Sequence, residues 1–166
     1  MPDSSAARIR YVLAGGLVAG AIDIGYACAF WAAAAGIAPP RILQSVAAGA
    51  MGSAAFEGGA RTAALGLALH FVIALSVAVV YFAAARRWRP LIERPWLLGM
   101  AYGVVVYLVM QLVVVPLSAA APGSRDPLWI ALSVLVHAVG IGVPSALGSR
   151  AALTTTRRHL SSGDST

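Results

Sequence analysis

Four long apolar segments, joined by short polar connections, restrict the fold of this chain more than any other feature of its sequence. They cover approximately residues 11–33, 61–85, 96–118 and 128–148. Each has the length of a membrane-spanning helix, which needs roughly 20 mostly apolar residues. A helix satisfies its backbone hydrogen bonds internally, whereas an open sheet edge in hydrocarbon leaves them unpaired. The sequence therefore predicts an all-α, polytopic membrane protein with four transmembrane helices.

The composition favours the same fold class. Of the 166 residues, 60% are hydrophobic and 11% are charged, whereas soluble domains carry about 25% charged residues. At this length we expect a single domain, over residues 1–153, followed by a polar and disordered cytoplasmic tail over residues 154–166. The net charge is +6, but the arginines flank the apolar segments and form no separate basic domain. We therefore expect the lipid bilayer as a partner, and no nucleic acid.

The positions of the arginines predict the orientation of the helices. All 12 basic residues are arginine, as is common in proteins of GC-rich bacteria. Nine lie on one side of the four segments: Arg8, Arg10, Arg86, Arg87, Arg89, Arg94, Arg150, Arg157 and Arg158. Three lie on the other side: Arg41, Arg61 and Arg125. Because arginine is enriched in cytoplasmic loops, we expect a bacterial inner-membrane protein with both termini in the cytoplasm.

A further segment, over residues 39–57, separates the first two spans. Pro39 and Pro40 suit the first turn of a helix, and the apolar residues that follow have helical spacing. The segment is too short to span a bilayer and too apolar for a free loop. We predict a short amphipathic helix at the outer face, with a re-entrant segment as the alternative.

Asp23 is the only formally charged side chain deep within the apolar segments. A carboxylate in hydrocarbon is costly unless it finds a partner, so an intramembrane ionisable residue is by default a site hypothesis. The other three segments each carry a polar group, His70, Gln111 and His137. All four lie about 10–14 Å below the outer surface, at a rise of about 1.5 Å per residue. Stripes of small residues predict that these faces approach one another.

These residue types favour ion chemistry. An aspartate beside a histidine in a low-dielectric interior would form a coupled titrating pair, suited to proton exchange or to binding a cation or polar solute. We predict a site of Asp23, His70 and His137, supported by Gln111 and Tyr107, in a protein for proton- or cation-coupled transport. Four helices barely enclose a pore, so transport would require a homo-oligomer. The alternative is a structural or assembly bundle in which the polar layer only fixes helix packing.

A second alternative is haem binding. His70 and His137, on different helices at equal depth, would then ligate one haem b. Otherwise we expect no cofactor, no metal site and no enzyme activity, because the chain has no HExxH, GxSxG or paired acidic motif. Cys28 is the single cysteine and forms no intrachain disulfide.

A resemblance to small, uncharacterised bacterial inner-membrane proteins with four helices is carried by GLVAGAIDIGYACAFW, ALHFVIALSVAVVYFAAARRW, VVVPLSAAAPGSRDPLW and IALSVLVHAVGIGVP. More distantly, the chain resembles the YagU-like family. That family also has a glycine-rich first helix, a histidine in the second helix and a histidine in the last. Its long outer insertion has no counterpart here. The resemblance implies an inner-membrane location and this architecture, and no particular activity.

Overall fold

The computed structural model describes residues 4–162, and all regular structure within that range is helical. Its elements are α1 (Ser4–Ala35), α2 (Pro39–Met51), a 3₁₀ helix η1 (Gly52–Phe56), α3 (Gly59–Arg87), α4 (Pro90–Glu93), α5 (Pro95–Val109), a π-helix η2 (Met110–Val114), α6 (Val115–Leu117), α7 (Pro127–Val136), a π-helix η3 (His137–Gly142) and α8 (Val143–Ser162). The range contains no β-strand.

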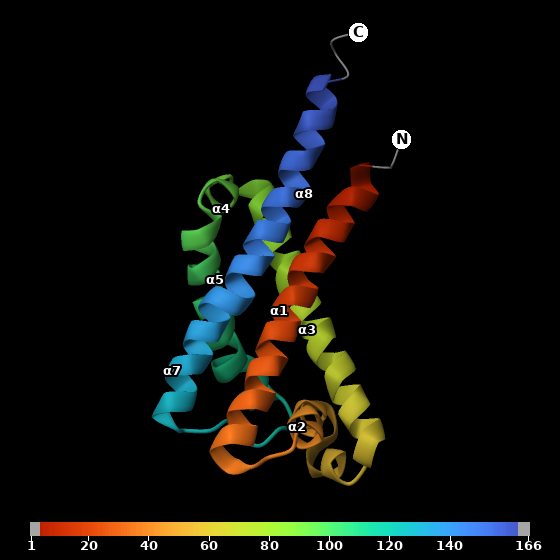
Figure 1. The fold of residues 1–166 in the computed structure, drawn as a ribbon, viewed down its shortest axis with the longest axis vertical. Helices are drawn as coiled ribbons and strands as arrows, with labels where there is room; N and C mark the ends of the chain where they lie inside the picture. Colours follow the sequence, from red (N-terminus) through yellow and green to blue (C-terminus); the bar gives the residue numbers. More distant parts are fainter. Residues whose placement is uncertain (1–3, 163–166) are drawn as a thin grey trace.

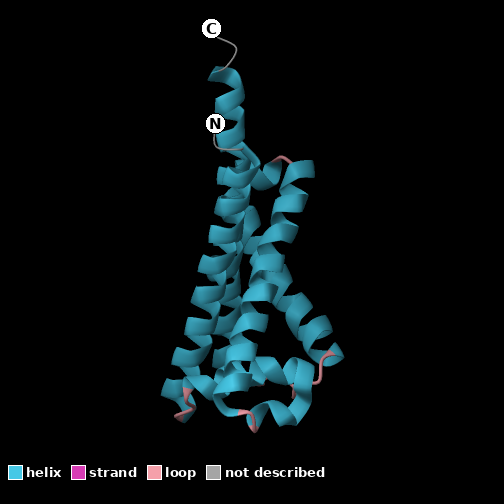
Figure 2. Ribbon diagram, turned by 90° about the vertical axis from the view of Figure 1, so that its right-hand side faces the viewer, coloured by secondary structure: helices cyan, strands magenta, loops and turns pink. Residues whose placement is uncertain are grey.

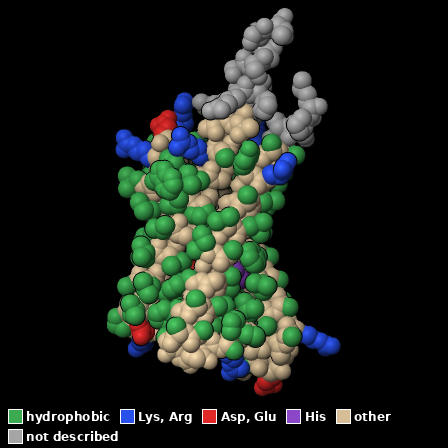
Figure 3. Space-filling view, viewed as in Figure 1, with side chains coloured by type: hydrophobic (Ala, Val, Ile, Leu, Met, Phe, Trp, Pro, Cys, Tyr) green, Lys and Arg blue, Asp and Glu red, His purple; other side chains and the backbone are tan. Residues whose placement is uncertain are grey.

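Four helical stretches are long and apolar enough to cross a membrane, which confirms the predicted all-α polytopic fold. They are Ser5–Ala35, Gly59–Arg87, Pro95–Leu117 and Pro127–Thr155. The last two are continuous helices that pass through the π segments η2 and η3. Figure 3 shows hydrophobic side chains over the middle of the molecule, with arginine and acidic side chains toward its two ends. Such an apolar outer surface suits contact with lipid, so the chain is an integral, multi-pass membrane protein.

The long helices lie side by side, and the connections gather at the two ends of the molecule (Figure 1). The start of α1, the short helix α4 and the end of α8 lie at one end, and α2 lies at the other. In Figure 2, α2 runs across the ends of the long helices. Helix α1 packs against α8 and α3, and α5 packs against η3 and α8.

Small residues allow the helices to approach closely. The buried face of α1 repeats every three or four residues, at Val12, Gly15, Ala19 and neighbouring positions. A Cβ on Gly15 would lie 2.6 Å from the carbonyl oxygen of Pro144 in α8. Only glycine permits that backbone contact, and close backbone contact is the main source of helix association where lipid removes the hydrophobic drive.

Prolines explain where the third and fourth spans change their winding. Each π segment ends two residues before a proline, Pro116 after η2 and Pro144 after η3. A proline has no N–H and its ring clashes with the carbonyl four residues earlier, so the preceding turn widens. The sequence predicts ordinary α-helices at these positions and does not indicate the two π segments.

The predicted outer helix exists, and it packs against the start of α3. The buried Gln44 side chain donates from Nε2 to the carbonyl oxygen of Gly59 at 3.0 Å and to Thr62 Oγ1 at 3.3 Å. Gly66 lies so close to α2 that a Cβ there would overlap the carbonyl oxygen of Leu43. These contacts attach α2 to the bundle rather than leaving it as a separate surface helix.

The end of the chain differs from the sequence prediction. Helix α8 continues to Ser162, so residues 154–162 are helical where a disordered tail from residue 154 is predicted. The reason is local, because no glycine or proline interrupts the chain between Gly148 and Gly163. Residues 163–166 lie outside the described residues. The described helices also extend beyond the predicted spans, since hydropathy marks the apolar part of a helix and not its polar ends.

Candidate functional site

All five predicted site residues line one cavity of about 210 Å³ within the bundle. They come from every membrane-spanning stretch: Asp23 from α1, His70 from α3, Tyr107 from α5, Gln111 from η2 and His137 from η3. Val46 of α2 also lines the cavity, so the outer helix covers it at one end. The space is large enough for several water molecules, and its polar lining gives them partners.

Asp23 and His137 are two ionisable side chains of the cavity that lie in contact. Asp23 Oδ1 lies 3.7 Å from His137 Nδ1, and the two side chains are 23% and 14% exposed. His137 Nδ1 also lies 2.9 Å from the carbonyl oxygen of Ser133. Because a carbonyl oxygen only accepts, Nδ1 carries a proton, and in the neutral ring Nε2 is left as an acceptor. Protonation at Nε2 would turn this contact into an ion pair.

His70 has a different environment. Its Nε2 donates to the carbonyl oxygen of Gly20 at 2.9 Å, which links α3 to α1. Gly20 is buried, and a Cβ there would lie 2.9 Å from the Phe71 ring. The structure therefore places His70 on the cavity wall but joins it to the α1 backbone, while His137 is the histidine that faces Asp23.

Tyr107 and Gln111 occupy two further positions on the wall. The Tyr107 ring packs edge-on against His137, with ring centroids 5.3 Å apart. Gln111 also lines a second hollow of about 260 Å³ beside the connection between α6 and α7. Val115 lines both spaces as well. Gln111 thus lies between the buried cavity and the end of the molecule that carries α2.

Two further aromatic residues, Tyr26 and Trp129, also line the cavity, and the sequence does not single them out as site residues. Tyr26 stacks on Trp129 with ring centroids 5.1 Å apart, and its hydroxyl donates to the Trp129 carbonyl oxygen at 3.3 Å. The Tyr26 hydroxyl also lies 3.3 Å from Ser133 Oγ. Helical spacing provides a signal for two of these residues. Tyr26 follows Asp23 by three positions and Ser133 precedes His137 by four, so each shares a helix face with a site residue.

The cavity wall contains one acidic side chain, Asp23, and no arginine. When Asp23 is ionised and both histidines are neutral, the wall carries one formal negative charge, which favours a proton or a cation over an anion. Among the described residues, no group of three or more His, Cys, Asp and Glu side chains is placed to hold a metal ion.

Comparisons with protein-family models, with curated proteins and with solved structures found no match to this chain. The resemblance to the YagU-like family therefore stays a prediction. The fold and the cavity define the class: an integral membrane protein with four spans and an aspartate–histidine pair inside the bundle. The function is argued from that pair.

Proposed function

We propose that this protein binds a proton or a small cation at Asp23 and His137 and moves it across the membrane. The observation that carries the proposal is the 3.7 Å contact between Asp23 Oδ1 and His137 Nδ1 on the wall of a cavity inside the spans. An aspartate kept at membrane depth with a titratable partner is typical of ion and proton pathways. A packing role requires only a neutral polar side chain.

The chemistry of the pair supports coupling. Asp23 and His137 can each bind a proton and lie in contact, so the charge of the cavity depends on how many protons the pair holds. A cation that binds the deprotonated pair competes with those protons, and pH then controls occupancy. The rings of Tyr26, Tyr107 and Trp129 line the same space, and aromatic faces attract cations.

A route for the ion is supported at the α2 end. Gln111 and Val115 line both the cavity and the hollow next to the connection between α6 and α7. The π-helices η2 and η3 contain Gln111 and His137, and π segments occur frequently at functional sites. The cavity of one chain is small, so we propose that transport uses a homo-oligomer together with bending at the two proline-associated π segments.

The location that we propose is the bacterial inner membrane, with both chain ends in the cytoplasm. Nine of the 12 arginines belong to the side of the spans that carries both chain ends. The start of α1, α4 and the end of α8 lie at one end of the molecule (Figure 1), in agreement with an even number of spans. The excess of arginine in short loops favours the cytoplasmic side for that end.

Haem b binding by His70 and His137 gains no support from the geometry. Nε2 of His70 donates to Gly20, and the cavity of about 210 Å³ is smaller than the roughly 300–1,000 Å³ of most ligand pockets. Haem binding stays a prediction, and a Soret absorption band in the purified protein would support it.

The test of the proposal uses the full chain in liposomes. With a pH-sensitive dye inside and an imposed proton or cation gradient, the wild-type protein should produce a flux that depends on pH. Asp23→Asn keeps the shape of the side chain and removes its charge, so it should lower the flux by at least about tenfold, the size expected for a group that takes part in proton transfer. Glu57→Gln is the matched control, because Glu57 is exposed and does not line the cavity.

Two results would count against transport. The first is a flux of Asp23→Asn equal to that of the wild type, which would show that the carboxylate has no part in transport. The second is a failure of Asp23→Asn to elute as a single species in size-exclusion chromatography, which would favour the structural or assembly role for the polar layer.

A further inference from the structure

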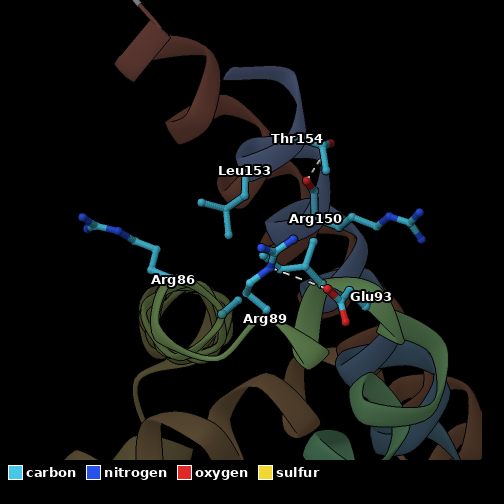
Figure 4. Close-up of a pocket in the computed structure, with 8 residues that line it drawn as sticks. Arg86, Arg89, Glu93, Arg150, Leu153 and Thr154 are labelled. Atoms are coloured by element: carbon cyan, nitrogen blue, oxygen red, sulfur yellow. Dashed lines mark hydrogen bonds and ion pairs between the residues drawn. The ribbon is translucent and has the colours of Figure 1, made fainter. Parts of the chain in front are cut away.

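A basic pocket lies at the opposite end of the molecule from α2. It has a volume of about 350 Å³ and is formed where α3, α4 and α8 meet. Three arginines line it, Arg86, Arg89 and Arg150, together with a single acidic residue, Glu93. In Figure 4, Arg89 extends toward Glu93, while the guanidinium groups of Arg86 and Arg150 extend to opposite sides. The proposed ion site does not use this pocket.

The charges of the pocket are only partly neutralised. Arg89 Nε lies 3.6 Å from Glu93 Oε1, and the two side chains are 70% and 59% exposed. Exposed ion pairs of this kind contribute little to stability and are easily exchanged for another anion. Among the described residues, this pair is the only arginine–carboxylate contact at the pocket. The pocket therefore keeps an excess of positive charge.

An apolar groove begins beside this pocket. It has a volume of about 330 Å³ and lies between α1 and α3, with a wall of aliphatic and aromatic side chains that includes Ile9, Leu13, Val79 and Phe82. Arg8 also lines the groove, and Arg86 lines both the groove and the basic pocket. The groove lies between two helices that are long and apolar enough to span a membrane, and several of its side chains are exposed on the surface of the molecule.

We propose that the pocket and the groove together bind one anionic phospholipid. In the complex, the Arg86 and Arg150 side chains, whose guanidinium groups extend to opposite sides in Figure 4, turn toward a phosphate beside Arg89. One acyl chain lies in the groove between α1 and α3. Guanidinium groups bind phosphate oxygens in pairs of parallel hydrogen bonds. The apolar length of the groove, which starts at the same arginine, is what favours a lipid over a soluble phosphate. Basic pockets between membrane helices are known to receive anionic head groups in this way.

The charge of the pocket also predicts which lipids are selected. A zwitterionic head group brings its own ammonium and does not neutralise the arginines, whereas phosphatidylglycerol carries a net negative charge. Glu93 is the exception in the pocket, because its carboxylate repels phosphate and occupies Arg89. Removing that carboxylate is therefore expected to strengthen binding, which a merely structural role for the ion pair does not predict.

The experiment measures lipid binding to the purified full-length protein by native mass spectrometry, with thermal unfolding as a second readout. Phosphatidylglycerol and phosphatidylcholine with identical acyl chains are compared, and inorganic phosphate is added in a separate series. The wild type should retain phosphatidylglycerol selectively. The double variant Arg86→Gln/Arg150→Gln should bind it about 30-fold more weakly, if each arginine contributes the usual amount near a membrane surface. Arg61→Gln/Arg125→Gln, which removes two exposed arginines from the other side of the spans, is the control.

Two more variants separate the head group from the acyl chain. Glu93→Gln should strengthen phosphatidylglycerol binding. Val79→Trp fills the groove from an exposed position and should weaken it without changing the response to phosphate. Equal retention of the two lipids would overturn the proposal, as would unchanged binding in the Arg86/Arg150 variant. If phosphate stabilises the protein as strongly as phosphatidylglycerol and Val79→Trp has no effect, the pocket binds a free anion and the lipid proposal is wrong. If the arginine variant does not fold, Glu93→Gln still decides, since weaker or unchanged binding there contradicts the proposal.

Discussion

At the scale of single residues, whether Asp23 is tolerated inside the bundle depends more on its partner than on its depth. A charged or hydrogen-bonding group inside a bundle is tolerated when another polar group satisfies it, and removing one partner leaves the other exposed to the full cost of desolvation. His137 lies 3.7 Å from Asp23, while His70 donates to the α1 backbone. The two histidines therefore have different surroundings, although they look equivalent in the sequence.

This difference predicts a coupling between Asp23 and His137. His137→Phe keeps a ring against Tyr107 but removes the polar partner of Asp23, so it should lower the stability by about 1–3 kcal/mol. The double variant Asp23→Asn/His137→Phe also lacks the carboxylate charge of residue 23. Part of the stability that His137→Phe loses should therefore be recovered. Thermal unfolding in detergent, followed by circular dichroism, measures the four proteins of the cycle.

His70→Phe is the control for this cycle. It removes one interhelical hydrogen bond, which should lower the free energy of unfolding by about 0.6 kcal/mol. This loss should be the same with aspartate or asparagine at residue 23. If the effects of Asp23→Asn and His137→Phe simply add, the two side chains are not coupled and the pair is not a functional unit.

At the scale of helices, glycines position the site. Gly103 of α5 faces the π segment η3, and a Cβ on it would overlap the carbonyl oxygen of His137 and lie 2.8 Å from Ala138 Cα. The backbone of η3 therefore rests directly on α5. Since the side chain of His137 starts from this backbone, the distance between α5 and η3 controls where its ring lies relative to Asp23.

Adding one methyl group at residue 103 should show how much the contact between α5 and η3 contributes to stability. Gly103→Ala forces α5 and η3 apart and should destabilise the protein by about 1–3 kcal/mol, as overpacking usually does. Gly25→Ala is the matched control, because a Cβ there meets no atom within 4 Å. In an exposed position of a helix, alanine replaces glycine without cost. Both variants are compared by thermal unfolding and by the flux assay; equal stability of the two would show that the α5–η3 contact is unimportant.

At the scale of the whole molecule, the two ends have different chemistry. The cavity lined by Asp23 lies toward the end that α2 crosses, and the other end carries the arginine pocket and both ends of the described chain (Figures 1 and 4). This asymmetry predicts a direction in the membrane, because arginine-rich ends of membrane proteins are usually retained in the cytoplasm.

The direction is testable with fusions in bacteria. Alkaline phosphatase joined after residue 166 should be inactive, and green fluorescent protein at the same place should fluoresce, because both report a cytoplasmic C-terminus. Alkaline phosphatase inserted within residues 119–126 should be active, since that connection joins the third and fourth spans at the opposite end. The reverse pattern would show that the arginines do not set the orientation.

Much of the fold follows from local sequence. The four spans and the helix at Pro39–Met51 lie where hydropathy and helical spacing predict them, since both signals depend on neighbouring residues only. The extent of α8 and the two π segments were not predicted. Helix α8 is longer than predicted because no helix breaker precedes Gly163. The π segments arise where a proline clashes with the preceding turn, and the effect of that clash on helix winding depends on the surrounding packing.

The sequence alone determined which apolar segment carries each polar group, and it predicted the depth of each group, because a helix rises by a fixed amount per residue and an apolar segment must match the thickness of the bilayer. It therefore predicted that Asp23, His70, Gln111 and His137 share one level. Only the tertiary structure decided that Asp23 faces His137 and that Tyr26 and Trp129 join the cavity. The rotation of each helix and the choice of its neighbour depend on backbone contacts between distant segments, such as Gly15 with Pro144 and Gly103 with His137. Hydropathy contains no information on these contacts.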